Sequence, residues 1–199
     1  MMKKQVIVIH GGDTFSTYEE FILFLKDFKI DLNRFRGKDW KSTLQDALGV
    51  EYDVLCPQMP NKQNAKYSEW KLWFDKIIPL LNDNIILVGH SVGGIFLVKY
   101  LAEENISKKI NATFLIATPY DMDGNRKIFE FVLPESLELF EKQGGKIFIY
   151  QSKDDPIVFR SEAEKYQRAL PNATVILFGD RGHFTQEELP ELIAEIKRI

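Results

Sequence analysis

The sequence predicts a doubly wound α/β fold, with a six-stranded, mostly parallel sheet and helices on both faces. Short runs of Val, Ile and Phe with little polar alternation are typical of strands buried on both faces of a parallel sheet. Segments with helical periodicity lie between these runs, and this alternation is the pattern of α/β domains. At 199 residues the chain is expected to form one domain, residues 1–199.

Six apolar runs are the predicted strands. They cover residues 5–9, 52–56, 85–88, 112–116, 146–150 and 174–178. Right-handed crossovers limit how such strands can be ordered. The order 2-1-3-4-5-6 would open a crevice between strands 1 and 3, at their carboxyl ends.

Five segments between and after the strands have helical spacing of apolar residues. They are residues 16–28, 67–81, 92–103, 159–170 and 189–199. In segment 67–81, Trp70, Trp73 and Phe74 are expected to face the core. Residues 29–50 and 118–145 are longer than ordinary connections. Each is either extra helix packed on an edge of the sheet or a cover over the crevice, and 118–145 is the candidate for a lid.

Composition excludes several classes of function. Lys plus Arg number 26 and Asp plus Glu 29, for a net charge of −3, so bulk basic charge cannot drive nucleic-acid binding. The apolar run 6–9 is too short for a signal peptide, and no stretch reaches the roughly 18 residues of a membrane span. We therefore expect a cytoplasmic protein. Cys56 is the only cysteine; it is expected to be a small buried hydrophobic residue.

The strongest local motif is Gly89-His90-Ser91-Val92-Gly93, a G-x-S-x-G sequence between a predicted strand and a predicted helix. Such a turn is so sharp that its central residue has a strained backbone. The flanking glycines avoid collisions, and the serine hydroxyl stands clear at the end of the sheet. The sequence therefore predicts Ser91 as a nucleophile.

A serine hydroxyl needs a general base, and the chain has three histidines. His90 adjoins the serine and is expected to point away from its hydroxyl, in a structural role. His10 ends the first strand. His183 follows the sixth strand, in a loop that can return over the serine, and is the predicted base.

The third member of a triad orients the imidazole. Asp154 and Asp155 follow the fifth strand, and the chain order Ser, Asp, His is that of one fold among the known triad folds. We favour Asp155, because a residue before a proline (Pro156) adopts extended geometry. Asp154 is the alternative, expected otherwise to accept backbone hydrogen bonds in the loop.

An oxyanion hole needs two backbone donors. One is expected to be the N–H of Val92, and the other comes from the loop after the first strand. Gly12 is the predicted second donor, with Asp13 as the alternative. The loop has neither G-x-G-x-x-G nor a P-loop lysine, which argues against a phosphate site. No zinc-like spacing is present, so we expect neither metal nor cofactor.

Four motifs together resemble the α/β-hydrolase superfamily: His10-Gly11-Gly12, the elbow around Ser91, Asp154-Asp155-Pro156 and Gly182-His183-Phe184. Within it the chain is similar to the small serine hydrolases related to retinoblastoma-binding protein 9. The resemblance implies an α/β-hydrolase fold without a large cap domain. It also implies a serine hydrolase with Ser91 as nucleophile, Asp155 as acid, His183 as base, and Gly12 and Val92 as donors.

We expect a carboxylesterase-like enzyme (EC 3.1) that acts on small carboxylic esters or thioesters through an acyl-enzyme. The alternative is a protein-interaction module on a hydrolase scaffold, with weak or residual activity. The expected partner is a small ester, and nothing indicates a nucleic acid, a membrane or a protein. Five aromatic residues flank the site loops and are predicted to line an apolar pocket: Phe15, Trp40, Tyr120, Phe159 and Phe184.

Overall fold

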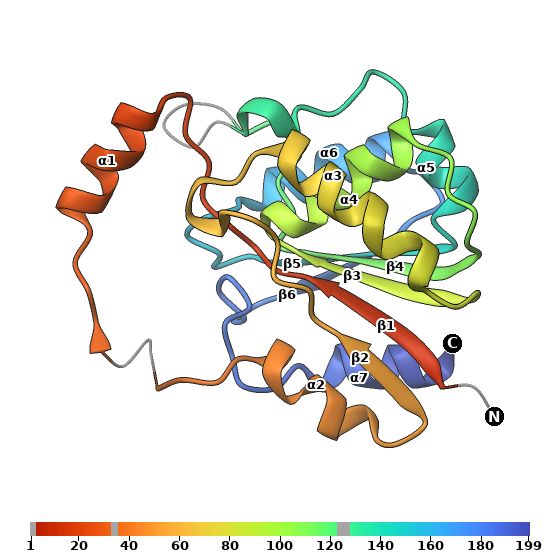
Figure 1. Cartoon of the computed structure of the whole chain (residues 1–199). Coiled ribbons are helices and arrows are strands. Elements are labelled where there is room, and N and C mark those ends of the chain that lie inside the picture. The colour runs from red at the N-terminus through yellow and green to blue at the C-terminus, as the bar shows by residue number, and fades with distance from the viewer. Residues whose placement is uncertain (1–2, 33–35, 123–127) are drawn as a thin grey trace.

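A six-stranded sheet forms the centre of the computed structural model, which describes residues 3–32, 36–122 and 128–199 (Figure 1). Its strands are β1 (Lys4–Ile9), β2 (Tyr52–Leu55), β3 (Ile85–His90), β4 (Ile110–Ile116), β5 (Lys146–Ser152) and β6 (Thr174–Phe178). Their order is β2-β1-β3-β4-β5-β6, and every neighbouring pair is parallel. The predicted topology is confirmed, and the strands start or end within two residues of their predicted bounds.

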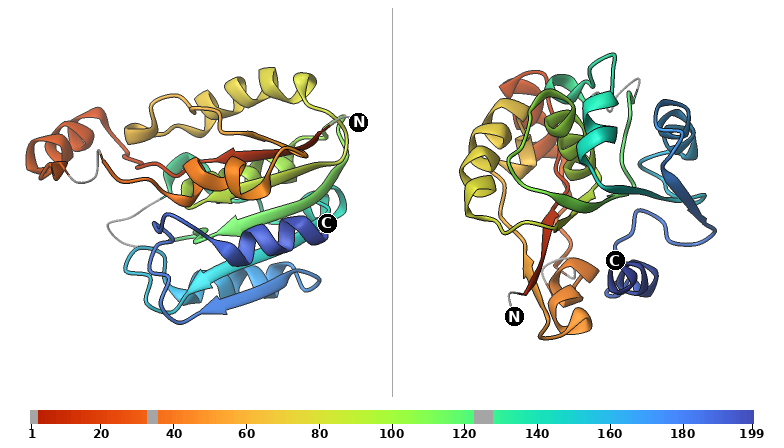
Figure 2. Two further views of the ribbon diagram at one scale, coloured as in Figure 1. Left: turned by 90° about the horizontal axis from the view of Figure 1, so that it is seen from below. Right: turned by 90° about the vertical axis from the view of Figure 1, so that its right-hand side faces the viewer.

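Successive residues of the central strands enter opposite cores. Ile7 and Ile9 of β1 belong to one buried cluster, and Val6 and Val8 to another. The first core contains α3 (Tyr67–Ile77), α4 (Val92–Glu103), α5 (Glu138–Gln143) and α6 (Arg160–Ala169), and the second contains α2 (Trp40–Leu48) and α7 (Pro190–Arg198). Figures 1 and 2 show these two groups on opposite faces of the sheet.

Local sequence explains where the helices begin. The Thr17 hydroxyl accepts the N–H of Glu20 at the start of α1 (Tyr18–Asp27), and the Asp39 carboxylate accepts two N–H groups at the start of α2. Both are ordinary N-caps. The predicted helix 67–81 ends earlier, because α3 gives way to a 3₁₀ turn, η3 (Ile78–Leu80), that contains Pro79.

The two long connections contain additional helix. Segment 29–50 supplies α2, whose Trp40, Leu44 and Leu48 are buried under the sheet, so the interpretation as extra helix is right for this part. Segment 118–145 supplies α5 and a 3₁₀ turn, η5 (Phe129–Phe131); its residues 123–127 lie outside the described chain. Of the helices described, none has the length and apolar composition to cross a bilayer.

Candidate active site

Ser91 has the backbone conformation of a nucleophile elbow. It lies between β3 and α4 with φ 54° and ψ −123°, a region that L-residues other than glycine adopt only under strain of roughly 1–3 kcal/mol. Its N–H donates to the carbonyl of Ile116, 2.8 Å away, which anchors the turn to β4. The side chain is thereby held at the carboxyl end of the sheet, where the sequence predicted it.

Glycines make this turn sterically feasible. A Cβ on Gly89 would lie 2.5 Å from the Cα of Gly94, and one on Gly93 would collide with the carbonyl oxygen of Ile9. Helix α4 therefore begins in direct contact with both β3 and β1. The residue pattern around Ser91 reflects close backbone packing, as the G-x-S-x-G motif predicted.

His183 and Asp155 form a hydrogen-bonded pair. The Nδ1 atom of His183 lies 2.9 Å from Oδ2 of Asp155, whose side chain is fully buried. The other oxygen, Oδ1, accepts the N–H groups of Ile157 and Val158 at 2.8 and 3.0 Å. Both carboxylate oxygens therefore act as hydrogen-bond acceptors, and Nδ1 of His183 is the donor to Oδ2. The Nε2 lone pair of His183 is then the one that faces away from Asp155.

Asp154, in the same loop, makes hydrogen bonds to other groups. Its Oδ1 accepts the Ser152 hydroxyl at 2.5 Å and the Gly182 N–H at 2.9 Å. These hydrogen bonds lower the pKa of Asp154. The structure thus places Asp155 against the imidazole, and Asp154 joins the loop after β5 to the loop that carries His183.

The His183 loop is anchored from beneath by two aromatic side chains. Nε2 of His90 donates to the carbonyl of His183, and the indole Nε1–H of Trp40 donates to the carbonyl of Phe184, both at 2.9 Å. The His90 and His183 rings lie 5.0 Å apart. Because His90 adjoins Ser91, these contacts hold the base beside the nucleophile.

The Ser91 hydroxyl makes no hydrogen bond within the described chain. The structure therefore pairs His183 with Asp155 but does not pair Ser91 with His183. Hydrogen bonds between nucleophile and base are often long in enzymes without substrate, and they tighten in the reacting complex.

A cavity of about 340 Å³ opens above Ser91, and Gly12 and Val92 line it too. Neither of their N–H groups is engaged within the described residues, so both can face a ligand. The N–H of Asp13, in contrast, donates to the carbonyl of Lys62 at 2.9 Å. The alternative donor Asp13 is therefore wrong, because its amide is already occupied.

His10 fixes the peptide group that carries the Gly12 N–H. Its Nε2 accepts the N–H of Met59 at 2.9 Å, and its Nδ1 lies 2.7 Å from the carbonyl oxygen of Gly11. Since Nε2 is an acceptor, Nδ1 carries the proton and donates to Gly11. The Gly11 carbonyl and the Gly12 N–H belong to one peptide plane, so His10 orients this N–H. The sequence showed only that His10 ends a strand, and its role was missed.

The prediction that five aromatic residues line the pocket is mostly wrong. Of the five, only Phe15 lines the cavity. Trp40 and Phe184 are buried in the core beneath the sheet. There the Trp40 indole donates to the Phe184 carbonyl and so holds the His183 loop. Tyr120 packs edge-on against Tyr166, and Phe159, 63% exposed, precedes α6; neither lines the cavity.

The cavity has an apolar wall that the sequence analysis did not assign to it. Its members come from α1, from segment 118–145 and from the loop between β5 and α6: Phe24, Pro119, Met122, Ile128, Ile157 and Val158. Two signals in the sequence pointed to it: the length of segment 118–145, the candidate cover over the crevice, and the helical spacing that includes Phe24. That spacing indicated an apolar helix face without saying what it faces.

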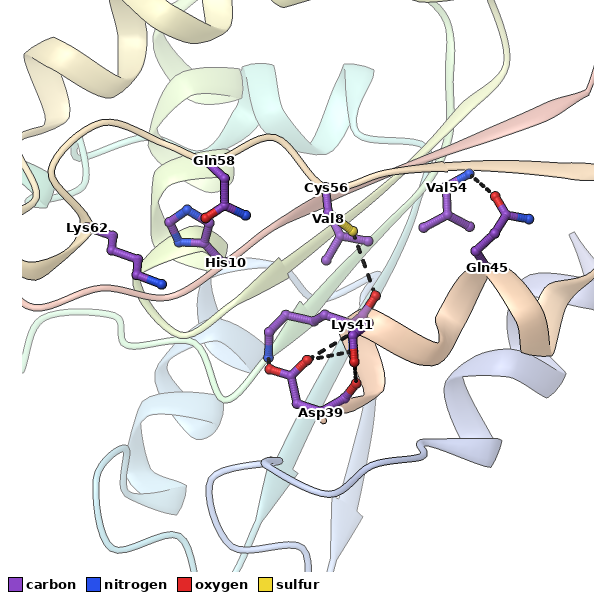
Figure 3. A pocket seen from close by; sticks show the side chains of 10 residues that line it. Val8, His10, Asp39, Lys41, Gln45, Val54, Cys56, Gln58 and Lys62 are labelled. Atoms are coloured by element: carbon purple, nitrogen blue, oxygen red, sulfur yellow. Dashed lines mark hydrogen bonds and ion pairs between the residues drawn. The ribbon is translucent and has the colours of Figure 1, made fainter. Parts of the chain in front are cut away.

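A second cavity, of about 430 Å³, lies between β1, β2 and the start of α2 (Figure 3). His10, Lys41, Cys56 and Lys62 line it, and Ser91 does not. Cys56 is exposed here, so its predicted burial is wrong: the strand ends one residue earlier, at Leu55. Among the described residues, no three acidic, His or Cys side chains are grouped to hold a metal.

Comparisons with known proteins show the family and the fold. A family model described as serine hydrolase matches residues 33–191. Serine hydrolase RBBP9 of Rattus norvegicus is 26% identical over 148 residues, which cover 74% of this chain and 78% of that protein. The structure of the ydeN gene product of B. subtilis has a TM-score of 0.70 at 18% identity, with 98% of each chain covered. Est1E of Butyrivibrio proteoclasticus with bound ferulic acid has a TM-score of 0.61 at 15% identity, covering all of this chain and 88% of that one. The last two show the α/β-hydrolase fold.

The backbone strain at Ser91 should be measurable as a difference in unfolding free energy between two variants. Glycine adopts positive φ without cost, so Ser91→Gly should unfold with a free energy about 1 kcal/mol higher than Ser91→Ala. Urea denaturation of the two variants measures this difference. Equal stabilities would show that the turn stores no strain at this residue.

Stability should fall as the pH drops below about 6.5. Burial lowers the pKa of His90 well below its usual value, with nearby Lys41 and His183 acting in the same direction. The unfolded chain then binds a proton that the folded chain does not, which costs up to about 1.4 kcal/mol per pH unit. His90→Gln, which keeps a donor for the His183 carbonyl, should show a smaller loss between pH 7 and 5.5 in urea titrations. An unchanged slope in that variant would contradict the assignment.

Trp40→Phe should weaken the His183 loop. The variant leaves the buried Phe184 carbonyl without its donor, which costs roughly 1–3 kcal/mol of unfolding free energy. Any reaction that uses His183 as a base should slow as the imidazole loses its fixed position. Trp73→Phe is the matched control, because Trp73 is 45% exposed. Denaturation and steady-state rates measure both effects; equal behaviour of the two variants would argue against the anchor.

Proposed function

The chain belongs to the serine hydrolase family, and from this premise we propose that it hydrolyses small carboxylic esters or thioesters through a Ser91–His183–Asp155 triad. The observation that carries the proposal is the hydrogen-bonded pair of His183 and buried Asp155, next to a strained serine that opens onto a cavity. A base oriented by a buried carboxylate is what a serine needs to become a nucleophile.

Acylation follows from the positions of the groups. Ser91 Oγ attacks the ester carbonyl carbon while Nε2 of His183 takes the hydroxyl proton, and Asp155 stabilises the imidazolium. The carbonyl oxygen becomes an oxyanion that accepts hydrogen bonds from the Gly12 and Val92 N–H groups. The tetrahedral intermediate then collapses: the bond to the alcohol oxygen breaks, His183 donates its proton to the leaving alcohol, and the acyl group stays on Ser91.

Deacylation reverses these roles. Water attacks the acyl carbon and gives a proton to Nε2 of His183. The second oxyanion occupies the same two N–H groups. Its collapse breaks the bond to Ser91 Oγ, which recovers the proton from His183, and a carboxylic acid leaves. No other reactant is needed, because water supplies both the hydroxyl and the proton.

The hydrogen bond between His10 and the Gly11 carbonyl supports this oxyanion hole. A hydrogen bond to a carbonyl oxygen polarises its peptide group, which makes the N–H of the same group a better donor. Burial lowers the pKa of His10, so the neutral ring that accepts from Met59 is the form present at neutral pH. The Gly12 N–H is therefore held in orientation before a substrate binds.

Labelling with a fluorophosphonate tests the proposal. Wild type should form one adduct on Ser91, and Ser91→Ala should form none and hydrolyse p-nitrophenyl acetate at least about 1,000-fold more slowly. Peptide mapping locates the adduct. A folded wild type that neither labels nor hydrolyses esters, yet captures a protein partner, would favour the interaction-module alternative.

The two adjacent aspartates give a matched pair of variants. Asp155→Asn should lower kcat by about 1,000-fold or more, because a neutral amide does not stabilise the imidazolium and its N–H can donate to Nδ1, which favours the wrong tautomer. Asp154→Asn loses loop hydrogen bonds but leaves the imidazole its partner, so its loss should be far smaller. Steady-state kinetics on one ester compares them. Equal losses, or the reverse order, would move the acid to Asp154.

A further inference from the structure

Helix α1 stands apart from both cores. None of its residues, all of them described, is buried, and Figures 1 and 2 show it projecting beyond the end of the sheet. It still presents large apolar side chains to solvent: Tyr18 is 65% and Leu25 is 45% exposed. Because α1 is not packed in a core, its apolar residues are not explained by the folding of the domain.

Apart from Leu23, the apolar residues of α1 form one face. Phe21, Phe24 and Leu25 are spaced as neighbours on a helix surface. The charged residues lie elsewhere on the helix: Glu19, Glu20, Lys26 and Asp27. The helix is therefore amphipathic, yet its apolar face contributes nothing to either core.

A series of aromatic rings connects this face to the nucleophile. The Phe24 ring lies 5.0 Å from Phe15 and 5.3 Å from Phe28, and Phe15 lies 5.5 Å from Phe21. Phe15 and Phe24 both line the cavity above Ser91. The cavity that contains Ser91 is thus bordered by aromatic rings that continue onto the outer part of α1.

The position of Phe15 is fixed by the body of the protein. The Lys66 ammonium donates to the Phe15 carbonyl at 2.8 Å, and Lys66 immediately precedes α3. Met122, Ile128 and Val158 add further apolar surface to the cavity, while Asp13 and Thr14 are its polar lining next to Gly12. A ligand that fits this lining has an apolar chain, and its polar end lies at Ser91, beside the Gly12 and Val92 N–H groups.

We propose that α1 is a substrate-binding element, and that the ester hydrolysed at Ser91 carries an apolar acyl chain of medium length that lies along Phe15, Phe24 and the apolar face of α1. This rests on the proposed function, and it names the substrate class. The acyl carbonyl sits at Ser91, and the chain extends outward along the apolar lining. Chains longer than the cavity continue over the outer residues of α1, which accounts for their exposure.

The test is a series of p-nitrophenyl esters with one leaving group and acyl chains of two, four and eight carbons, assayed as monomers. Each buried methylene is worth a factor of about four, so kcat/KM should rise from acetate to octanoate by about 100-fold or more even with partial burial. Phe24→Ala should lower the octanoate-to-acetate ratio by about tenfold. Leu23→Ala is the matched control: it lies on α1, is exposed, does not line the cavity, and should leave the ratio unchanged.

The outcomes separate this inference from the proposed function. If no ester is hydrolysed in a Ser91-dependent manner, the proposed function fails. If acetate is hydrolysed in that manner but the rate does not rise with acyl length, or the ratio is the same in Phe24→Ala, the acyl-chain inference fails alone. A preference for long alkyl acetates instead of long acyl chains would also overturn it. So would a stable dimer that is lost in Leu25→Glu, because α1 would then cover a second copy.

Discussion

The close approach of helix α4 to strands β1 and β3 is the constraint on which the site depends. It leaves no room for a Cβ at Gly89 or Gly93, and it forces Ser91 to a positive φ. That strain is offset by the hydrogen bond to Ile116 and by the burial of α4 in the larger core. This geometry places Ser91 and the Val92 N–H beside the end of β1. The Gly12 N–H lies there too, and all three residues line the same cavity.

The two faces of the sheet have different parts in this arrangement. The face covered by α3 and α4 presents the nucleophile, and the face covered by α2 and α7 holds the base. Trp40, at the first turn of α2, reaches the His183 loop through the Phe184 carbonyl, and its own N–H donates to Gln186 at 2.8 Å. Trp40 therefore packs in the core and also positions the loop that carries His183. The position of the imidazole depends on the position of this backbone.

Features set by local sequence could be predicted, and those set by distant contacts could not. The elbow follows from glycine spacing, and the parallel sheet follows from apolar runs. Trp40 and Phe184 were predicted to line a pocket because aromatic residues near site loops often do. Their actual roles depend on a hydrogen bond between residues 144 positions apart, which no local pattern encodes. Phe24 had the reverse problem: its helical spacing was visible, but the spacing does not say whether a face meets a core or a cavity.

His10 and His90 differ from His183 in their hydrogen-bond partners, although all three flank the reaction centre. Both nitrogens of His10 are engaged by backbone groups, and His90 is buried with one nitrogen on the His183 carbonyl. Burial lowers the pKa of each, so each remains a neutral backbone ligand. His183 alone has a buried carboxylate partner at Nδ1, and its Nε2 has no hydrogen-bond partner among the described residues. The partners of each ring, more than its distance from Ser91, therefore determine which histidine can accept and return a proton.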